Sequence, residues 1–346
     1  MTASFPLTGD GGVFVIAEAG VNHDGDVAKA ERLIEAAAQA KADAVKFQTW
    51  KPGEITGRFA YKVSYMDDTT AMDESRYELS RRLCLPYDAF RHLQDHARRA
   101  GILFLSTPDG FDSLDFLVDE LKLPCIKIGS TELTHPQFLE AAGRKGLPVI
   151  LSTGIGSLGE VEEAVAAVRR GGSAPLALLH CTSQYPAPDE EINLRAMTTL
   201  RAAFGLPVGL SDHSTGLEAG IAATALGACI VEKHFTLDRS LPGPDHRASL
   251  DPEGLADYVR AIHRTARLLG DGQKRPTASE LRNASGIRRS VVAARDLPAG
   301  TALEPADLIC KRPADGVPPA HLPLLVGRLT KRTLEADEPI RWIDVQ

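Results

Sequence analysis

Residues 14–49 decide the fold class, and they read FVIAEAGVNHDGDVAKAERLIEAAAQAKADAVKFQT. A short apolar run, FVIAEA, is followed by a segment over 27–40 whose apolar residues recur at helical spacing, and a second run, AVKFQT, ends the stretch. The apolar positions of both runs are near-continuous, which is typical of strands that are covered on both faces. The stretch therefore predicts a β-α-β unit with parallel strands.

The same alternation continues along most of the chain. Six further apolar runs begin at Ile102, Cys125, Pro148, Leu176, Pro207 and Cys229. Amphipathic helices are expected over 87–100, 160–170, 216–226 and 252–269. Eight β-α units within about 270 residues match the size of an α/β (β/α)₈ TIM barrel, whereas a doubly wound open sheet usually has fewer strands. The connection over 52–97 is long, and we expect it to include a loop over the barrel mouth.

The sequence changes character after Gly270. The stretch GDGQKRPTASELRNASG is polar and turn-rich, and the short β-like pieces SVVAARDL and DLICKRP follow it. We expect a barrel domain over 1–270, a linker over 271–285 and a small β-rich domain over 286–346. A domain of about 60 residues is small for independent stability, so we expect it to dock on the barrel or on another subunit.

Composition and charge exclude several classes of protein. Hydrophobic residues make up 43% and charged residues 25%, which excludes a disordered or collagen-like chain. Basic residues number 39 against 46 acidic ones, and the net charge of −7 opposes nonspecific binding to nucleic acid. Five scattered cysteines without a CxxC pair predict neither a disulfide framework nor a cysteine zinc site. Without a leader-like N-terminus or an apolar run that could span a bilayer, we expect no membrane insertion and a cytoplasmic location.

Polar side chains follow every predicted strand. In a barrel of this kind the carboxyl ends of the strands meet at one face, where the active site lies. In strand order these residues are Glu18; Lys46 and Gln48; Ser106 and Thr107; Lys127, Ser130 and Glu132; Ser152 and Thr153; His180, Thr182 and Tyr185; Ser211 and His213; and Glu232, Lys233 and His234. Any one of them suits a capped turn, but polar groups at all eight ends favour a site at this face.

Lys46 and Lys127 point to an anionic ligand. Both are expected within strands, where an unpaired ammonium group costs several kcal/mol to bury and therefore needs a partner. A phosphate or a carboxylate would supply that partner, and hydroxyl groups and turn amides beside the lysines would bind it as well.

His213 and His234 end consecutive predicted strands, which lie about 4.8 Å apart in a sheet, so two imidazoles could share one metal ion there. No thiolate is expected nearby, which favours Mn²⁺ or Mg²⁺ over a structural zinc. The segment LPGPDHRAS over 241–249 predicts a rigid loop after the eighth strand. This loop would hold Asp245 over the site, or it is an exposed turn with Asp245 as a local cap.

Nearly the whole chain resembles the sialic acid (nonulosonic acid) synthases. The family's motifs occur in order: FVIAEAGVNHDG from Phe14, DAVKFQT from Asp43, LSTP from Leu105, KIGSTE from Lys127, ILSTG from Ile150, LLHCTSQYPAP from Leu178, GLSDHS from Gly209, EKHFTLDRSLPGPDH from Glu232 and KRPADG from Lys311. The C-terminal part is similar to the antifreeze-like (SAF) domain of that family.

The resemblance implies a metal-dependent condensation of phosphoenolpyruvate with an open-chain N-acetylmannosamine-type sugar, releasing phosphate and giving a nine-carbon α-keto acid. It implies His213 and His234 as ligands of a divalent metal, Mn²⁺ first and Mg²⁺ or Co²⁺ as alternatives. It implies Glu18 and Asp245 as the acid-base and water-positioning carboxylates. The residues implied around phosphoenolpyruvate are Lys46, Thr107, Lys127, Ser130, Ser152 and Ser211. Those implied near the sugar are Gln48, Glu132 and Tyr185, joined by Arg312 from the SAF domain of a partner subunit in a domain-swapped homodimer.

Sugar choice stays open at this point. Asp109, Gly129, Thr131 and Ala314 depart from the family's motifs. N-acetylmannosamine, and hence N-acetylneuraminate synthase activity, is the main hypothesis. The alternative is its 6-deoxy diacetamido relative, the precursor of legionaminic acid, and a 6-phosphate sugar is a third option. A different barrel aldolase or isomerase for phosphosugars, or a barrel that only binds an anionic sugar, are remoter alternatives.

Overall fold

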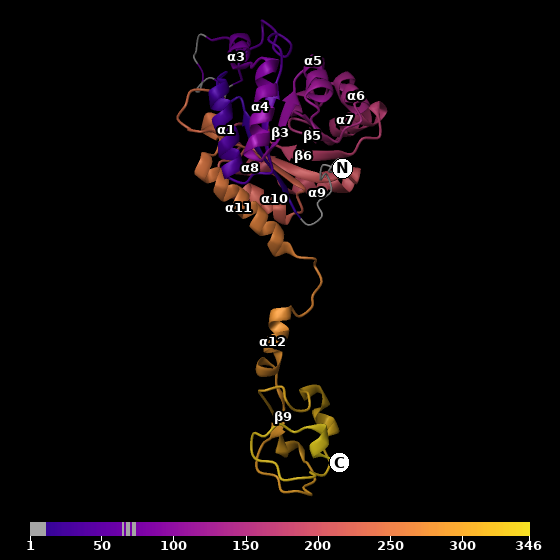
Figure 1. Cartoon of the computed structure of the whole chain (residues 1–346). Helices are drawn as coiled ribbons and strands as arrows, with labels where there is room; N and C mark the ends of the chain where they lie inside the picture. Colours follow the sequence, from indigo (N-terminus) through magenta and orange to yellow (C-terminus); the bar gives the residue numbers. More distant parts are fainter. Residues whose placement is uncertain (1–11, 64–65, 67–69, 71–73) are drawn as a thin grey trace. The chain divides into compact units, whose positions relative to one another are not determined.

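The chain forms two compact units, Met1–Gly270 and Asp271–Gln346, in the computed structural model (Figure 1). The structure describes residues 12–63, 66, 70 and 74–346. The prediction that the N-terminus carries no leader falls on residues outside these ranges. Within them, no helix combines the length and the apolar character that crossing a bilayer requires.

Eight parallel strands form the sheet of the first unit. They are β1 (Phe14–Gly20), β2 (Ala44–Thr49), β3 (Leu103–Pro108), β4 (Ile126–Ile128), β5 (Val149–Ser152), β6 (Leu176–Cys181), β7 (Val208–Asp212) and β8 (Ile230–His234). Their order in the sheet is β3-β2-β1-β8-β7-β6-β5-β4, and β3 also lies beside β4. The sheet therefore closes almost completely on itself, which confirms the predicted barrel.

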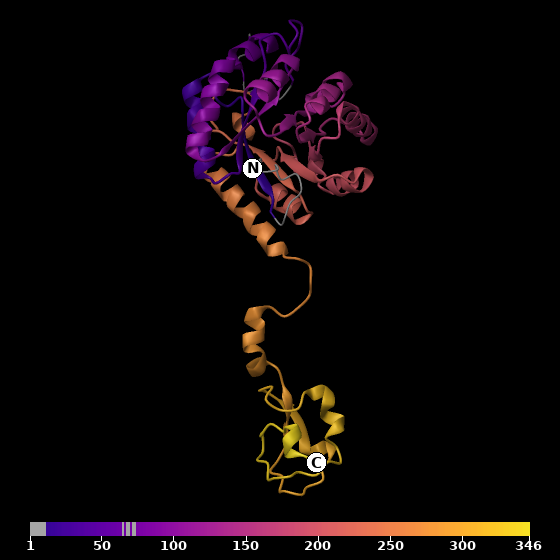
Figure 2. The ribbon, with the colours of Figure 1, turned by 45° about the vertical axis from the view of Figure 1, so that its right-hand side comes forward.

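Helices surround this barrel (Figures 1 and 2). They are α1 (Val27–Gln39), α3 (Arg76–Leu83), α4 (Tyr87–Ala100), α5 (Phe111–Asp115), α6 (Pro136–Arg144), α7 (Leu158–Gly171), α8 (Asp189–Ile192), α9 (Arg195–Phe204), α10 (Glu218–Ala225) and α11 (Pro252–Leu269). The starts of α1, α7 and α11 follow from their capping residues, because Asp26, Ser157 and Asp251 accept hydrogen bonds from first-turn amides. The sequence did not single out α6 or α9.

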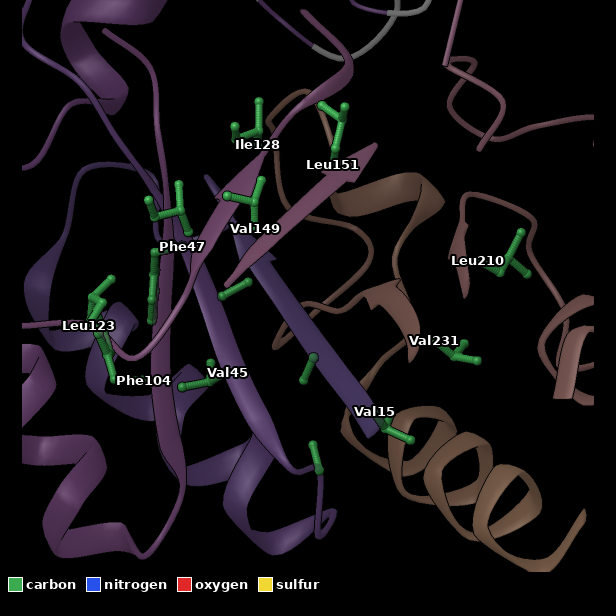
Figure 3. Close-up of a cluster of buried hydrophobic side chains, with 14 of the residues drawn as sticks. Val15, Val45, Phe47, Phe104, Leu123, Ile128, Val149, Leu151, Leu210 and Val231 are labelled. Atoms are coloured by element: carbon green, nitrogen blue, oxygen red, sulfur yellow. The ribbon is translucent and has the colours of Figure 1, made fainter. Parts of the chain in front are cut away.

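Two apolar layers hold the barrel together. Ile16, Leu105, Ile150, Leu179 and Ile230 come from different strands and pack in the barrel interior. The neighbouring residues on the same strands point the other way and pack under the helices, as the side chains in Figure 3 show. Because each strand supplies both layers, its sequence is near-continuously apolar rather than alternating.

The second unit has its own small core. Strands β9 (Ser290–Ala293) and β10 (Leu308–Lys311) pair antiparallel, and Val291, Leu303 and Leu334 are buried beside them. Helix α12 (Ala278–Ile287) lies in the stretch expected to be a linker, and it begins with a capping box between Thr277 and Glu280. The expected linker over 271–285 therefore contains the greater part of a helix.

Lys233 does not face the barrel mouth, contrary to expectation. Strand alternation turns it away from Glu232 and His234, and its Nζ lies 3.0 Å from Oδ2 of Asp212. The hydroxyl of Tyr258 on α11 donates to the same oxygen at 2.9 Å. The side chains of the ion pair are 0% and 1% exposed, so the pair and Tyr258 form a dry link between β7, β8 and α11.

We expect Lys233→Ala to lower the free energy of unfolding by about 3–5 kcal/mol, because it leaves the Asp212 carboxylate buried without a cation. Lys29→Ala is the matched control, since Lys29 pairs with Asp24 at the partly exposed surface and should cost about 1 kcal/mol or less. Urea unfolding followed by circular dichroism measures both. Equal losses in the two variants would contradict the buried link.

Candidate active site

A cavity of about 670 Å³ opens at the carboxyl ends of the barrel strands. All eight strands or the residues just after them contribute to its lining. The long connection after β2 adds Glu54, Ile55, Thr56 and Val63, and α3 adds Arg76. The described part of this connection thus borders the barrel mouth, which agrees with the loop expected there.

A network of four buried charges lines the cavity. Nζ of Lys46 lies 2.6 Å from Oε2 of Glu18 and 3.5 Å from Oε2 of Glu232. Nζ of Lys127 lies 3.6 Å from Oε1 of Glu232. The carboxylate of Glu232 therefore stands between two ammonium groups. The lysines thus have carboxylate partners within the protein, whereas the sequence had led us to expect a bound anion as their partner.

Hydroxyl groups add hydrogen bonds to this network. Lys46 donates to Oγ1 of Thr107 at 3.0 Å, and Lys127 donates to Oγ of Ser152 at 2.8 Å. The hydroxyl of Ser211 donates to Glu232 at 2.8 Å. Both ammonium groups are thus fixed in place while they still border the open cavity.

The two carboxylates of the network ionise differently. Burial raises the pKa of Glu18, and Lys46 offsets only part of that effect. Burial would raise the pKa of Glu232 as well, but the charges of Lys127 and Lys46 outweigh this effect. The pKa of Glu232 therefore lies below its ordinary value. Glu232 is therefore the permanent counter-charge, and Glu18 is the group that can gain or lose a proton near neutral pH.

His213 and His234 lie side by side at the ends of β7 and β8, with ring centroids 5.4 Å apart. Nδ1 of His213 lies 2.6 Å from the carbonyl oxygen of Thr182, and since a carbonyl only accepts, this nitrogen donates and leaves Nε2 with a lone pair. Nδ1 of His234 is buried without a hydrogen-bond partner. Burial lowers the pKa of both imidazoles, which favours the neutral form that binds metal. The pair fits a divalent metal ion.

Asp245 lies directly beside this pair. Its Oδ2 is 3.8 Å from Nδ1 of His234. Gly20 has a φ of +52°, and a Cβ there would lie 3.4 Å from Oε1 of Glu18 and 3.5 Å from Oδ2 of Asp245. A Cβ would fit at these distances, so the glycine is explained by its positive φ rather than by crowding. Burial raises the pKa of Asp245 to about 6. The loop over 241–249 holds Asp245 buried against His234 rather than in an exposed turn, although Asp245 itself is not among the residues that line the cavity.

A second group of lining side chains is acidic. It comprises Glu54, Asp109 and Glu132, of which Glu132 pairs with Nδ1 of His135 at 2.5 Å. Burial raises the pKa of Asp109 to about 7, and the nearby Glu132 acts in the same direction. Such carboxylates suit hydroxyl and amide donors of an uncharged sugar.

The structure brings most of the predicted site residues to one cavity. Those that line it are Glu18, Lys46, Gln48, Thr107, Lys127, Ser130, Glu132, Ser152, Tyr185, Ser211, His213 and His234. Gln48 donates to Glu18 at 3.2 Å, and the ring of Tyr185 packs on that of His213 with centroids 4.1 Å apart. Arg312 belongs to the second unit, where its Nε donates to the carbonyl of Ile287.

Several polar strand ends point elsewhere, which corrects the expectation that all of them face the site. Ser106 bonds Thr49, Thr153 donates to the carbonyl of Leu179, His180 bonds the carbonyl of Ile192, and Thr182 donates to that of Glu191. They occupy the pleats that alternate with the inward residues, or the loops just beyond the strands. A count of polar residues at strand ends therefore overestimates the site.

Among the aspartate, glutamate, lysine and arginine residues that line the cavity, no individual role had been assigned from the sequence to Glu54, Arg76, Asp109 and Glu232. Glu232 had been expected at the eighth strand end, and it stands two positions before His234 on one strand and so shares its face. Asp109 had been noted only as a departure from a motif. Glu54 and Arg76 lie in the long connection, where no periodicity fixes which side chains turn inward.

Comparisons with known proteins agree with this fold. The model of the NeuB family matches residues 33–274, and that of the SAF domain matches residues 288–346. The N,N'-diacetyllegionaminic acid synthase of Campylobacter jejuni is 43% identical over 94% of this chain and 98% of its own length. That of Legionella pneumophila is 41% identical over 96% and 94%.

A solved structure shares the architecture. The N-acetylneuraminic acid synthetase of Leptospira borgpetersenii superposes with a TM-score of 0.70 at 37% identity, covering 79% of this chain and 90% of that one. Barrel, cavity and SAF domain together define a synthase of nonulosonic acids. The chain belongs to the NeuB family.

We expect Asp109→Asn to raise the free energy of unfolding, and more so at pH 8 than at pH 4. The carboxyl ionises near 3.8 in the unfolded chain and near 7 in the folded one. Between these values the folded state binds more protons, so rising pH destabilises the wild type. The side-chain amide of the variant does not ionise, and the gain at pH 8 reaches up to about 4 kcal/mol.

Denaturant unfolding at both pH values measures this difference. Asp112→Asn is the control, because Asp112 is an exposed acid that pairs with Lys51 and should show no such gain. If Asp109→Asn and Asp112→Asn gave the same pH trend, Asp109 would not be a buried acid with a raised pKa.

Proposed function

We propose that this chain condenses phosphoenolpyruvate with an open-chain 2,4-diacetamido-2,4,6-trideoxymannose, as a legionaminic acid synthase does. The observation that carries the proposal is the pair of buried ammonium groups beside two neutral imidazoles in one cavity. Phosphoenolpyruvate has a phosphate and a carboxylate, and a sugar aldehyde has a carbonyl oxygen for a metal to polarise.

Lys46 and Lys127 are the anion-binding groups in this proposal. Their ammonium groups bind the phosphate and the carboxylate, and the hydroxyls of Thr107, Ser130 and Ser152 donate further hydrogen bonds. The hydroxyl of Ser211 donates to Glu232 and so holds that carboxylate in place. Glu232 keeps the two cations together without cancelling both charges, since a single carboxylate faces two ammonium groups. The four-group network carries one net positive charge when Glu18 is protonated, and it is neutral when Glu18 is ionised.

His213 and His234 are the proposed ligands of a divalent cation, with Mn²⁺ as the first choice. When bound, the cation supplies Lewis-acid polarisation of the sugar carbonyl. Gln48, Glu132 and Tyr185 orient the sugar, and Asp109 accepts a hydrogen bond from one of its hydroxyl or amide groups.

Glu18 is the proposed proton acceptor. Attack of C3 of the enol on the aldehyde carbon forms the new C–C bond and leaves positive charge at C2. Glu18 stabilises that charge, orients the water that adds at C2 and takes its proton, which its raised pKa favours. Asp245, beside His234, helps to position this water. Glu18 then gives the proton from this water to the former aldehyde oxygen, which becomes a hydroxyl. Collapse of the adduct forms the C2 carbonyl and breaks the C2–O bond to phosphate, which leaves with the proton of the C2 hydroxyl.

We base the choice of sugar on the names of the similar proteins rather than on the sequence motifs. N-acetylmannosamine was the main hypothesis, but the two relatives reported above at 43% and 41% identity are both named legionaminic acid synthases. We therefore favour the diacetamido sugar. N-acetylmannosamine remains the second candidate because of the Leptospira structure.

Arg312 completes the proposal. We assign it to the sugar of a second copy of the chain, which requires a domain-swapped homodimer. Its guanidinium would bind an N-acetyl carbonyl, a planar acceptor that suits a planar donor.

We expect the EDTA-treated chain to release phosphate from phosphoenolpyruvate only when both Mn²⁺ and a sugar are added. The value of kcat/KM should be at least about tenfold higher with the diacetamido sugar than with N-acetylmannosamine, since a pocket built for an amide discriminates strongly against its loss. Phosphate assay and mass spectrometry of the product measure this.

N-acetylmannosamine 6-phosphate completes the substrate panel. A preference for N-acetylmannosamine would move the proposal to the second candidate. Phosphate release without any sugar, or none with all three sugars, would refute the proposed reaction.

A further inference from the structure

A second cluster of histidine and glutamate side chains lies on the outside of the barrel, between α1 and α4. His92 and His96 are four residues apart on α4, and Glu31 and Glu35 are four residues apart on α1. Residues at this spacing share one face of a helix. None of the four lines the cavity described above.

Three of these residues already gather their ligand atoms. Nε2 of His92 lies 2.6 Å from Oε1 of Glu31, and Nδ1 of His96 lies 3.5 Å from the same oxygen. One ligand atom from each of Glu31, His92 and His96 lies within 4.8 Å of the others. Ligands at about 2.0–2.1 Å from a tetrahedral zinc ion stand about 3.3 Å apart, so small side-chain movements suffice.

Glu35 fixes the tautomer of His96. Its Oε1 lies 3.2 Å from Nε2 of that ring, and since a carboxylate only accepts, Nε2 donates. In the neutral ring, Nδ1 then carries a lone pair that faces the carboxylate of Glu31. The lone pair of Nδ1 and the Glu31 carboxylate repel each other, and a cation between them removes this repulsion. The hydrogen bond of a metal-binding histidine from its other ring nitrogen to a carboxylate, as from Nε2 of His96 to Glu35, is a common arrangement.

We propose that His92, His96 and Glu31 bind one zinc-type divalent cation, with Glu35 as the residue that orients His96. Two imidazoles and a carboxylate without a thiolate suit Zn²⁺, and also Co²⁺, Ni²⁺ or Cu²⁺, better than Mg²⁺ or Ca²⁺. The cation takes the place of the proton between His92 and Glu31. That proton moves to Nδ1 of His92 or to solvent. Water fills the fourth position.

The surroundings are preorganised and open to solvent. α1 and α4 pack side by side (Figure 1), with Leu33 and Ile34 of α1 and Leu93 and Ala97 of α4 in the buried core. The side chain of His92 is 51% exposed, that of Glu31 30% and that of His96 19%, so an ion can enter without unfolding. A bound cation cross-links the two helices, and the expected role is stabilisation of this side of the barrel rather than chemistry.

The test counts zinc bound to the tag-free, EDTA-treated full chain after dialysis against Zn²⁺ alone. We expect His96→Ala and Glu31→Gln each to bind about one equivalent less than the wild type. The difference is the readout, because His213 and His234 take up zinc equally in all variants. At a hundredfold excess over Kd, zinc should raise the wild-type Tm by roughly 5 °C more than that of His96→Ala.

His263→Ala is the matched control, since His263 is a partly exposed histidine beside a single carboxylate, Asp43. It should keep the full zinc content. Glu31→Gln retains the shape of the side chain and guards against a loss caused by misfolding. Equal zinc content in the wild type, His96→Ala and Glu31→Gln would overturn the proposal, as would a Kd of about 1 mM or weaker, or the same loss in His263→Ala.

Discussion

One carboxylate between two ammonium groups is the constraint on which the site depends. Glu232 faces Lys46 and Lys127 inside a barrel whose lining is otherwise apolar below this level. Without Glu232, two cations would lie close together in a poorly solvated space, at a cost that the apolar core would have to offset. With it, each lysine has a carboxylate partner, and both ammonium groups still border the cavity in which a ligand would bind.

The rest of the site follows from this arrangement and from the pleat of the strands. Glu18 pairs in register with Lys46 on β2 and with His234 on β8, and Glu232 lies two positions before His234. Lys46 therefore has two carboxylate neighbours, and these differ in how readily they ionise. Burial raises the pKa of Glu18, whereas the neighbouring lysines hold the pKa of Glu232 below its ordinary value. His234, two positions beyond Glu232, shares its face and meets His213 from the next strand.

The barrel was predictable because eight near-continuous apolar runs leave few other folds, and most of the site was predictable because strand ends converge at one face. Whether a single side chain points into the barrel or away from it could not be predicted from the sequence. Ser106 and Thr107 are adjacent, yet only Thr107 lines the cavity, and Lys233 turns outward to Asp212 between two inward residues. Register fixes these directions, and register depends on pairing between distant segments. Glu35 and His96 likewise meet only because α1 and α4 pack together.

Calorimetric titration of phosphoenolpyruvate tests the central claim most directly, because it measures the anion site without any turnover. We expect Lys127→Met to weaken binding at least about a hundredfold relative to the wild type, since it removes a charge-assisted contact to the anion. Lys145→Met, which removes a lysine paired with Asp115 and Asp119 on the helical surface, should leave it unchanged. Equal affinity in the wild type and Lys127→Met would contradict the account.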